Sequence, residues 1–236
     1  MTDSKIKLDQ ATIEASDDAN AQEFLQQEML RTDNLLATLP PTATLERAAA
    51  LLARANALLG LNRQIEAWTD ARIAFDIFIT AERWPDAVEC CDVLYQTDQP
   101  ASITALAHGI WLSVTYPIDP EQTIVIMNYL IDETPANSDG AAVAAATAHY
   151  VVGLRCEDEA RHNSLAFLTG NMIARVAQRH GDIKSQQALD FWMHKLDLKD
   201  PQKFLPRLGL VLSAIVGEES SWWFNREQLR SRLPTQ

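Results

Sequence analysis

Residues 85–100, PDAVECCDVLYQTDQP, are followed by a segment of the same design at residues 120–135, PEQTIVIMNYLIDETP. The two segments start 35 residues apart, and each opens on proline and an acid, continues as an apolar run and closes on proline. Proline is favoured in the first turn of a helix and stops a helix that precedes it. A fixed period in the thirties is typical of stacked helical hairpins. We therefore expect helical hairpins over the region from Glu66 to Pro135.

Helical patterns continue on both sides of this repeated pair. Apolar residues recur at three- and four-residue steps from Thr44 onward, and Gly60 and Gly181 stand where left-handed residues close helices. The alanine-rich run at 141–155 is apolar all round, so we expect a central, surrounded helix there. Only eight glycines argue against a turn-dense β fold. The sequence predicts an all-α fold of about ten helices, arranged as a right-handed stack of antiparallel helical hairpins.

Breaks in composition divide the chain into three parts. Residues 1–40 form an acidic extension with one expected helix at about 19–39, which Pro40-Pro41 ends; residues before it are expected to be mobile unless a partner holds them. Residues 41–217 form the helical-hairpin repeat domain, and residues 218–236 form an aromatic segment with a capping helix. The N-terminal helix fits two roles, either a cap that docks on its own chain or an arm that binds in trans.

The turns between helices carry a second repeated cue, which resembles the tetratricopeptide family. In that family the turn within a hairpin reads Gly-Arg and the next helix starts Glu-Ala; here the matching residues are Leu59, Arg63, Glu66-Ala67 and Ala74, and then Glu82-Arg83-Trp84, Asp86-Ala87 and Leu94. The two cues lie 20 residues apart and not 34, and Asn62 and Glu82 replace the expected glycines. The resemblance covers about residues 44–135. It implies a tetratricopeptide-like α-solenoid that binds other proteins.

Charge and cysteine content limit the classes of partner and compartment. A net charge of −12 disfavours nucleic acid, because phosphate binding needs a lysine and arginine surface. An acidic surface suits a basic or amphipathic segment of another protein, but acidity also keeps a cytosolic protein soluble without any such partner. The longest apolar stretch, 141–154, is too short to span a bilayer, so no membrane insertion is expected. Three cysteines build no disulfide framework, and no signal-peptide pattern is present, so we expect a cytoplasmic protein with Cys90 and Cys91 in its core.

No catalytic signature is evident, and we predict no catalytic residue and no cofactor. The sequence lacks a nucleophile elbow and a glycine-rich phosphate loop. An alternative remains: an all-helical enzyme or metal- or ligand-binding protein that uses His149, Glu159 and His162. Glu159 and His162 have the Glu-x-x-His spacing of metal ligands, but di-iron bundles need two such pairs. His149 also fits a buried histidine with a hydrogen-bond partner.

The preferred interpretation is a non-catalytic adaptor, assembly factor, chaperone or accessory subunit whose groove holds another protein. The residues predicted to face that groove come from the first helices of the hairpins: Arg72, Asp76, His108, Trp111, His149 and Arg155. Trp222-Trp223-Phe224 fits either a cap over the last hairpin or an anchor for a partner. A third possibility is a structural subunit tethered through its N-terminal arm.

Overall fold

The structure of the chain is a computed structural model that describes residues 2–233, with side chains described from Ala19 onward. It is all-helical in this range, with eleven α-helices, one 3-10 turn and no β-strand. The α-helices are α1 Thr2–Thr38, α2 Thr44–Gly60, α3 Gln64–Thr80, α4 Trp84–Gln96, α5 Ser102–Thr115, α6 Pro120–Glu133, α7 Asp139–Arg155, α8 Glu159–Gly181, α9 Gln186–Lys195, α10 Pro201–Val216 and α11 Arg226–Arg230; the 3-10 turn η1 is Glu219–Ser221.

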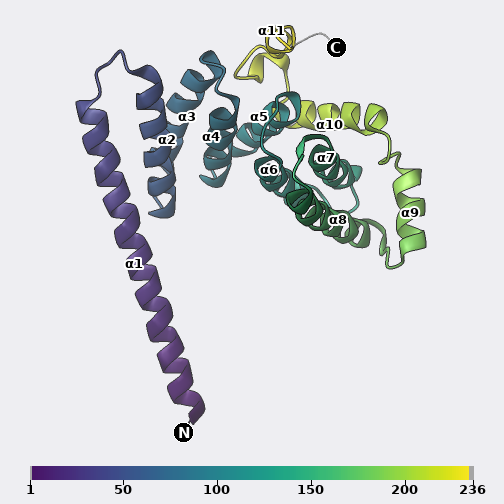
Figure 1. The fold of residues 1–236 in the computed structure, drawn as a ribbon, viewed down its shortest axis with the longest axis horizontal. Helices are drawn as coiled ribbons and strands as arrows, with labels where there is room; N and C mark the ends of the chain where they lie inside the picture. The colour runs from purple at the N-terminus through teal and green to yellow at the C-terminus, as the bar shows by residue number, and fades with distance from the viewer. Residues whose placement is uncertain (1, 234–236) are drawn as a thin grey trace.

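Consecutive helices pack in neighbouring pairs from α1 to α9 (Figure 1). Helices α2, α4, α6 and α8 also contact one another in that order, so they form one continuous layer. Helix α10 returns over α5 and α7 on the other side. The predicted all-α helical stack is therefore confirmed.

Helix α1 is longer than the sequence pattern predicted. It begins at Thr2, well before Ala19, because no helix breaker precedes Pro40-Pro41. Its second half lies along α2, and its first half extends past the end of α2 (Figure 1). The question that the sequence left open is answered for this second half, which docks on its own chain.

Two turns near the start of the stack have the same geometry. Asn62 and Glu82 both adopt the left-handed conformation, with φ of 58° and 57°, at the places where glycine was expected. After α2 the N–H of Arg63 donates to the carbonyl of Leu58 at 2.8 Å, and the equivalent bond after α3 is 2.9 Å long. This is the Schellman pattern of helix ends. The two repeated cues thus produce two equivalent turns.

The glycines predicted to close helices lie before the residues that make the left-handed turns. Gly60 and Gly181 are the last residues of α2 and α8, and the left-handed residues that follow are Asn62 and Asp182. Asparagine and aspartate tolerate this conformation better than other residues with a side chain. The helices end where predicted, but a different residue makes each turn.

The core is centred on α7, as its composition predicted. Every residue from Ala141 to Ala148 is buried, because α6, α8 and α10 all pack against this helix. Cys90 and Cys91 are fully buried in α4, and burial raises the pKa of both thiols. Both cysteines therefore act as core residues.

Candidate functional site

Most of the predicted partner-binding residues meet at one place, and the chain itself fills it. The fully buried ring of His108 stacks on Trp223, with 4.5 Å between centroids. Trp111 lies beside Trp222 and Phe224, at centroid distances of 6.4 and 5.2 Å. The aromatic segment after α10 therefore covers α5. This surface is not an open groove.

Two further predicted residues, on α3, join the same cluster. The guanidinium of Arg72 lies 4.2 Å from the ring centroid of Trp223, within the range of a cation–π contact. Arg72 also pairs with Asp76 one turn away. Phe75 lies edge-on to Trp223 at 5.5 Å. The C-terminal segment thus bridges α3 and α5.

His108 is held in one tautomer by its two neighbours. Its Nδ1 lies within hydrogen-bond distance of the Thr104 carbonyl, so this nitrogen carries the proton and donates. Its Nε2 is therefore free to accept the backbone N–H of Trp223 at 2.9 Å. Burial lowers the pKa of His108 to about 4. The ring is neutral near pH 7, as this pair of bonds requires.

His149 and Arg155 lie apart from the aromatic cluster. Arg155 donates to the carbonyls of Ser113, Val114 and Ile118, so its side chain closes the C-terminal end of α5. His149 is exposed at the α7–α8 contact, where its Nδ1 lies 2.8 Å from the Thr169 hydroxyl. The prediction of a hydrogen-bonded histidine is confirmed. The expectation that it is buried is wrong, because the residue as a whole is exposed and only its contact with Thr169 is partly covered.

The residues of the metal-site alternative are only partly brought together. The pKa of His149 is lowered mainly because its ring is partly covered at the Thr169 contact, and the charge of the nearby His162 adds to this effect. Glu159 is exposed in the first turn of α8. Across the described part of the chain, no group of three or more histidine, cysteine, aspartate or glutamate side chains is placed to hold a metal ion.

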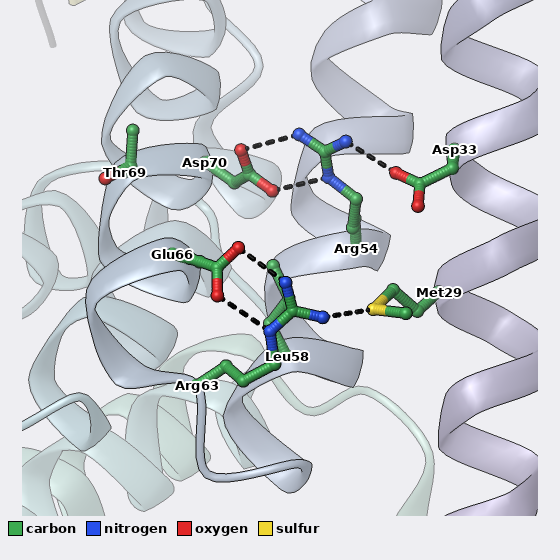
Figure 2. Close-up of a pocket in the computed structure, with 8 residues that line it drawn as sticks. All are labelled: Met29, Asp33, Arg54, Leu58, Arg63, Glu66, Thr69 and Asp70. Carbon is green, nitrogen blue, oxygen red and sulfur yellow. Dashed lines mark hydrogen bonds and ion pairs between the residues drawn. The ribbon is translucent and has the colours of Figure 1, made fainter.

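A polar cluster that the sequence did not reveal joins α1, α2 and α3. Arg54 on α2 makes a two-pronged contact with the buried Asp70, at 2.7 and 2.9 Å, and reaches Asp33 on α1 at 2.6 Å (Figure 2). The hydrogen bond to Asp70 is the main cause that raises the pKa of Arg54. Arg54 therefore links three helices through two carboxylates. The only feature of the sequence that could have indicated this cluster is an arginine on the apolar side of a helix.

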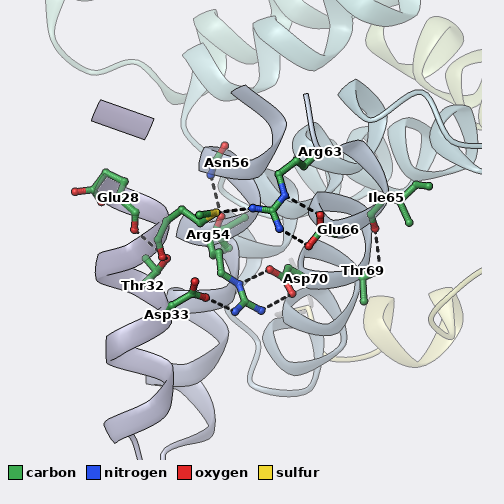
Figure 3. Close-up of polar contacts among 12 residues, drawn as sticks. Glu28, Thr32, Asp33, Arg54, Asn56, Arg63, Ile65, Glu66, Thr69 and Asp70 are labelled. Atoms are coloured by element: carbon green, nitrogen blue, oxygen red, sulfur yellow. Dashed lines mark hydrogen bonds and ion pairs between the residues drawn. The ribbon is translucent and has the colours of Figure 1, made fainter. Parts of the chain in front are cut away.

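A second arginine completes the same cluster. Arg63 pairs with Glu66 at 2.5 Å (Figure 3). It also donates to the sulfur of Met29 on α1 at 2.8 Å (Figure 2). The hollow between the two arginines measures about 400 Å³. Because each cation here already has a partner, the cluster's role is to hold α1 against the body.

Docking of α1 creates a groove between α1, α2 and α4, with a volume of about 440 Å³. Its apolar lining comes from the side chains Phe24, Leu25, Ala49, Leu52, Ala53 and Ala57. The polar lining is acidic apart from Asn56 and consists of Glu28, Asp86 and Glu89. Phe24 is 62% exposed. The groove therefore combines an open apolar surface with an acidic rim.

The carboxylates along α4 lack full compensation by cations. Asp86 pairs with Arg83, but Glu89 accepts only an amide hydrogen bond, from Asn56 at 3.3 Å. Burial raises the pKa of Glu89, and the charges of Asp86 and Asp92 add to this effect. Burial also raises the pKa of Asp92. Among the described residues neither Glu89 nor Asp92 has an ion-pair partner.

This acidic stripe was visible in the sequence but was not singled out. Asp86, Glu89 and Asp92 recur at steps of three, which places them on one face of a helix. What the sequence could not show is that α1 and α2 border the same face.

Comparisons with known proteins give no further assignment: no protein-family model, no curated protein and no solved structure matches this chain. Within residues 2–233 no helix is both long and apolar enough to cross a bilayer. The fold defines the class, an all-helical stack of neighbouring helix pairs.

Proposed function

We propose that this chain is a non-catalytic protein-interaction module that holds a basic, amphipathic helix of another protein in the groove between α1, α2 and α4. The observation that carries this proposal is the acidic rim beside an open apolar lining, in which Glu89 has no cation partner among the described residues. An amphipathic helix binds such a groove through its apolar face. Its cations then lie beside the carboxylates of α4.

Electrostatics favours a basic occupant over an acidic one. A carboxylate that burial has partly removed from water regains favourable interactions when a cation approaches it. Glu89 is in this condition, and the net charge of −12 adds a long-range attraction for basic segments. An acidic helix of the same shape would place like charges side by side. Charge therefore supplies the specificity of the proposed site.

The repeated turns support a tetratricopeptide-like arrangement. The turns at Asn62 and Glu82 share one geometry, and each is followed in the next helix by a fully buried alanine, Ala67 or Ala87. Alanine at such positions lets neighbouring helices approach closely. Stacked helical hairpins present extended surfaces for other proteins. We place the chain in the cytoplasm, as an adaptor, assembly factor or accessory subunit.

Two synthetic peptides test this function with the full chain. Both are short amphipathic helices with leucine along one face; one carries lysine and arginine on the other face, and the second carries glutamate there. We expect the basic peptide to bind at least about tenfold more tightly, a difference of about 1.4 kcal/mol, and to weaken as salt is raised. Equal affinity for the two peptides, or no binding of either, would overturn the proposal.

The matched control is an exposed acid outside the groove. Glu157 lies in the loop between α7 and α8. Glu157→Gln lowers the net negative charge by the same amount as Glu89→Gln, so it measures the effect of overall charge alone. We expect Glu89→Gln to lower the affinity for the basic peptide more than Glu157→Gln does.

A further inference from the structure

The C-terminal segment, residues 218–233, occupies a well-defined seat on α3 and α5. Trp223 gives the central contacts, with its N–H on His108 and its ring under Arg72. Farther along, the Tyr116 hydroxyl donates to the Leu229 carbonyl at 3.1 Å, and Arg232 pairs with Glu82 at 2.7 Å. The seat is formed by the side chains Trp68, Arg72, Phe75, His108, Trp111 and Tyr116.

Two hydrogen-bond donors remain unsatisfied where the C-terminal segment lies on its seat. The indole N–H groups of Trp111 and Trp222 are both buried and donate to no described residue. A buried donor without a partner costs free energy that a donor in water does not. The segment is therefore held less firmly than its aromatic contacts alone imply.

The connection to the helical stack runs through one residue of unusual conformation. Gly217 follows α10 with φ of 83°, which residues with a side chain rarely adopt. A small change of backbone angles at this glycine redirects the whole segment. The link can therefore serve as a hinge.

We propose that the C-terminal segment is exchangeable, and that the second occupant of the α3/α5 seat is the same segment of another copy of this chain. The structure shows one segment that fits the seat, and a second copy of the chain carries the same segment with every contact unchanged. Exchange of identical elements between protomers is an inexpensive route to a dimer. The product is a swapped dimer in which each segment crosses to its partner.

Complementation between two full-length variants tests exchange. Trp223→Ala weakens binding by the C-terminal segment but leaves the side chains of the seat unchanged. The double variant Trp68→Ala/Arg72→Ala weakens the seat but leaves the C-terminal segment unchanged. Trp68 and Arg72 are only partly buried, so the core is left in place. We expect each variant alone to sediment as a monomer and the equimolar mixture to form a heterodimer. A mixture that sediments as the sum of two monomers would overturn the proposal.

A second measurement guards against misfolding of the double variant. The free peptide 218–233 is titrated into the Trp223→Ala chain, whose seat is intact, and saturable binding is expected; absence of binding would contradict a separable segment. A third variant tests the hinge. Gly217→Ala strains only the monomer in which the segment lies on its own chain, so it should raise the dimer fraction by a factor of roughly 5 to 30. An unchanged dimer fraction would rule out Gly217 as the hinge and with it the exchange.

Discussion

His108 on α5 accepts the backbone N–H of Trp223 at 2.9 Å, across 115 residues of sequence. The bond needs a neutral imidazole, and burial lowers the pKa of His108 to about 4. In the unfolded chain the pKa of histidine is about 6.5. Below pH 6.5 the unfolded chain binds a proton that the folded chain does not. The free energy of unfolding therefore decreases as the pH decreases.

The pH dependence of stability follows from this pair of values. The stabilising contribution of neutral His108 is complete above about pH 6.5 and is lost as the pH falls toward 4. We expect the free energy of unfolding to drop by about 2 kcal/mol between pH 7.5 and pH 5 from this residue. Urea titrations at both values measure it. His108→Gln, which keeps an acceptor but does not titrate, should show a smaller drop; an identical drop would assign the effect to other groups.

Arg54 tests the polar cluster between α1, α2 and α3. Arg54→Ala leaves Asp70 buried without its cation, and we expect a loss of about 3 kcal/mol in the free energy of unfolding. Asp33→Ala removes the exposed end of the same cluster and should cost less than about 1 kcal/mol. Chemical denaturation measures both. Similar losses for the two variants would contradict the role of Asp70 as the buried partner.

Replacing glycine by alanine should have opposite effects on stability at two mid-helix positions. A Cβ at Gly109 would lie 2.7 Å from the Cβ of Cys91 on α4, so Gly109→Ala should destabilise by about 1–3 kcal/mol. A Cβ at Gly170 on α8 meets nothing within 4 Å. Gly170→Ala should therefore stabilise by about 0.5–1 kcal/mol through helix propensity alone. Thermal unfolding compares them, and a change of the same sign at both positions would refute the close approach of α4 and α5.

Glu82 tests the repeated turn geometry. A glutamate at φ of 57° is strained, and Glu82→Gly should relieve about 1 kcal/mol. Glu82 also pairs with Arg232, so Glu82→Gln serves as the control that loses the ion pair but keeps the strain. The Glu82→Gly variant should have a higher free energy of unfolding than the Glu82→Gln variant. A glycine variant less stable than the glutamine variant would show that the left-handed turn is absent.

Local signals in the sequence predicted much of the fold. Pro120 opens α6, and α1 ends just before Pro40-Pro41, as the sequence predicted. These features depend on neighbours a few residues away, which the sequence displays directly.

Long-range relationships could not be predicted in the same way. The seat of Trp223 on His108 and the pairing of Arg54 with Asp33 join helices whose relative placement depends on the whole stack. The residues predicted to face a groove lie on α3, α5 and α7, where the C-terminal segment and α10 pack. The groove bordered by α1 was missed because docking of α1 was left open.

In the proposed function, charge on α4 selects a basic helix. The most direct measurement is a charge swap: titration of the basic and the acidic peptide into the wild-type chain and into Glu89→Lys. We predict that Glu89→Lys weakens the basic peptide about tenfold or more and strengthens the acidic peptide, because a cation then stands in the acidic rim. An unchanged affinity of Glu89→Lys for the basic peptide would contradict the account.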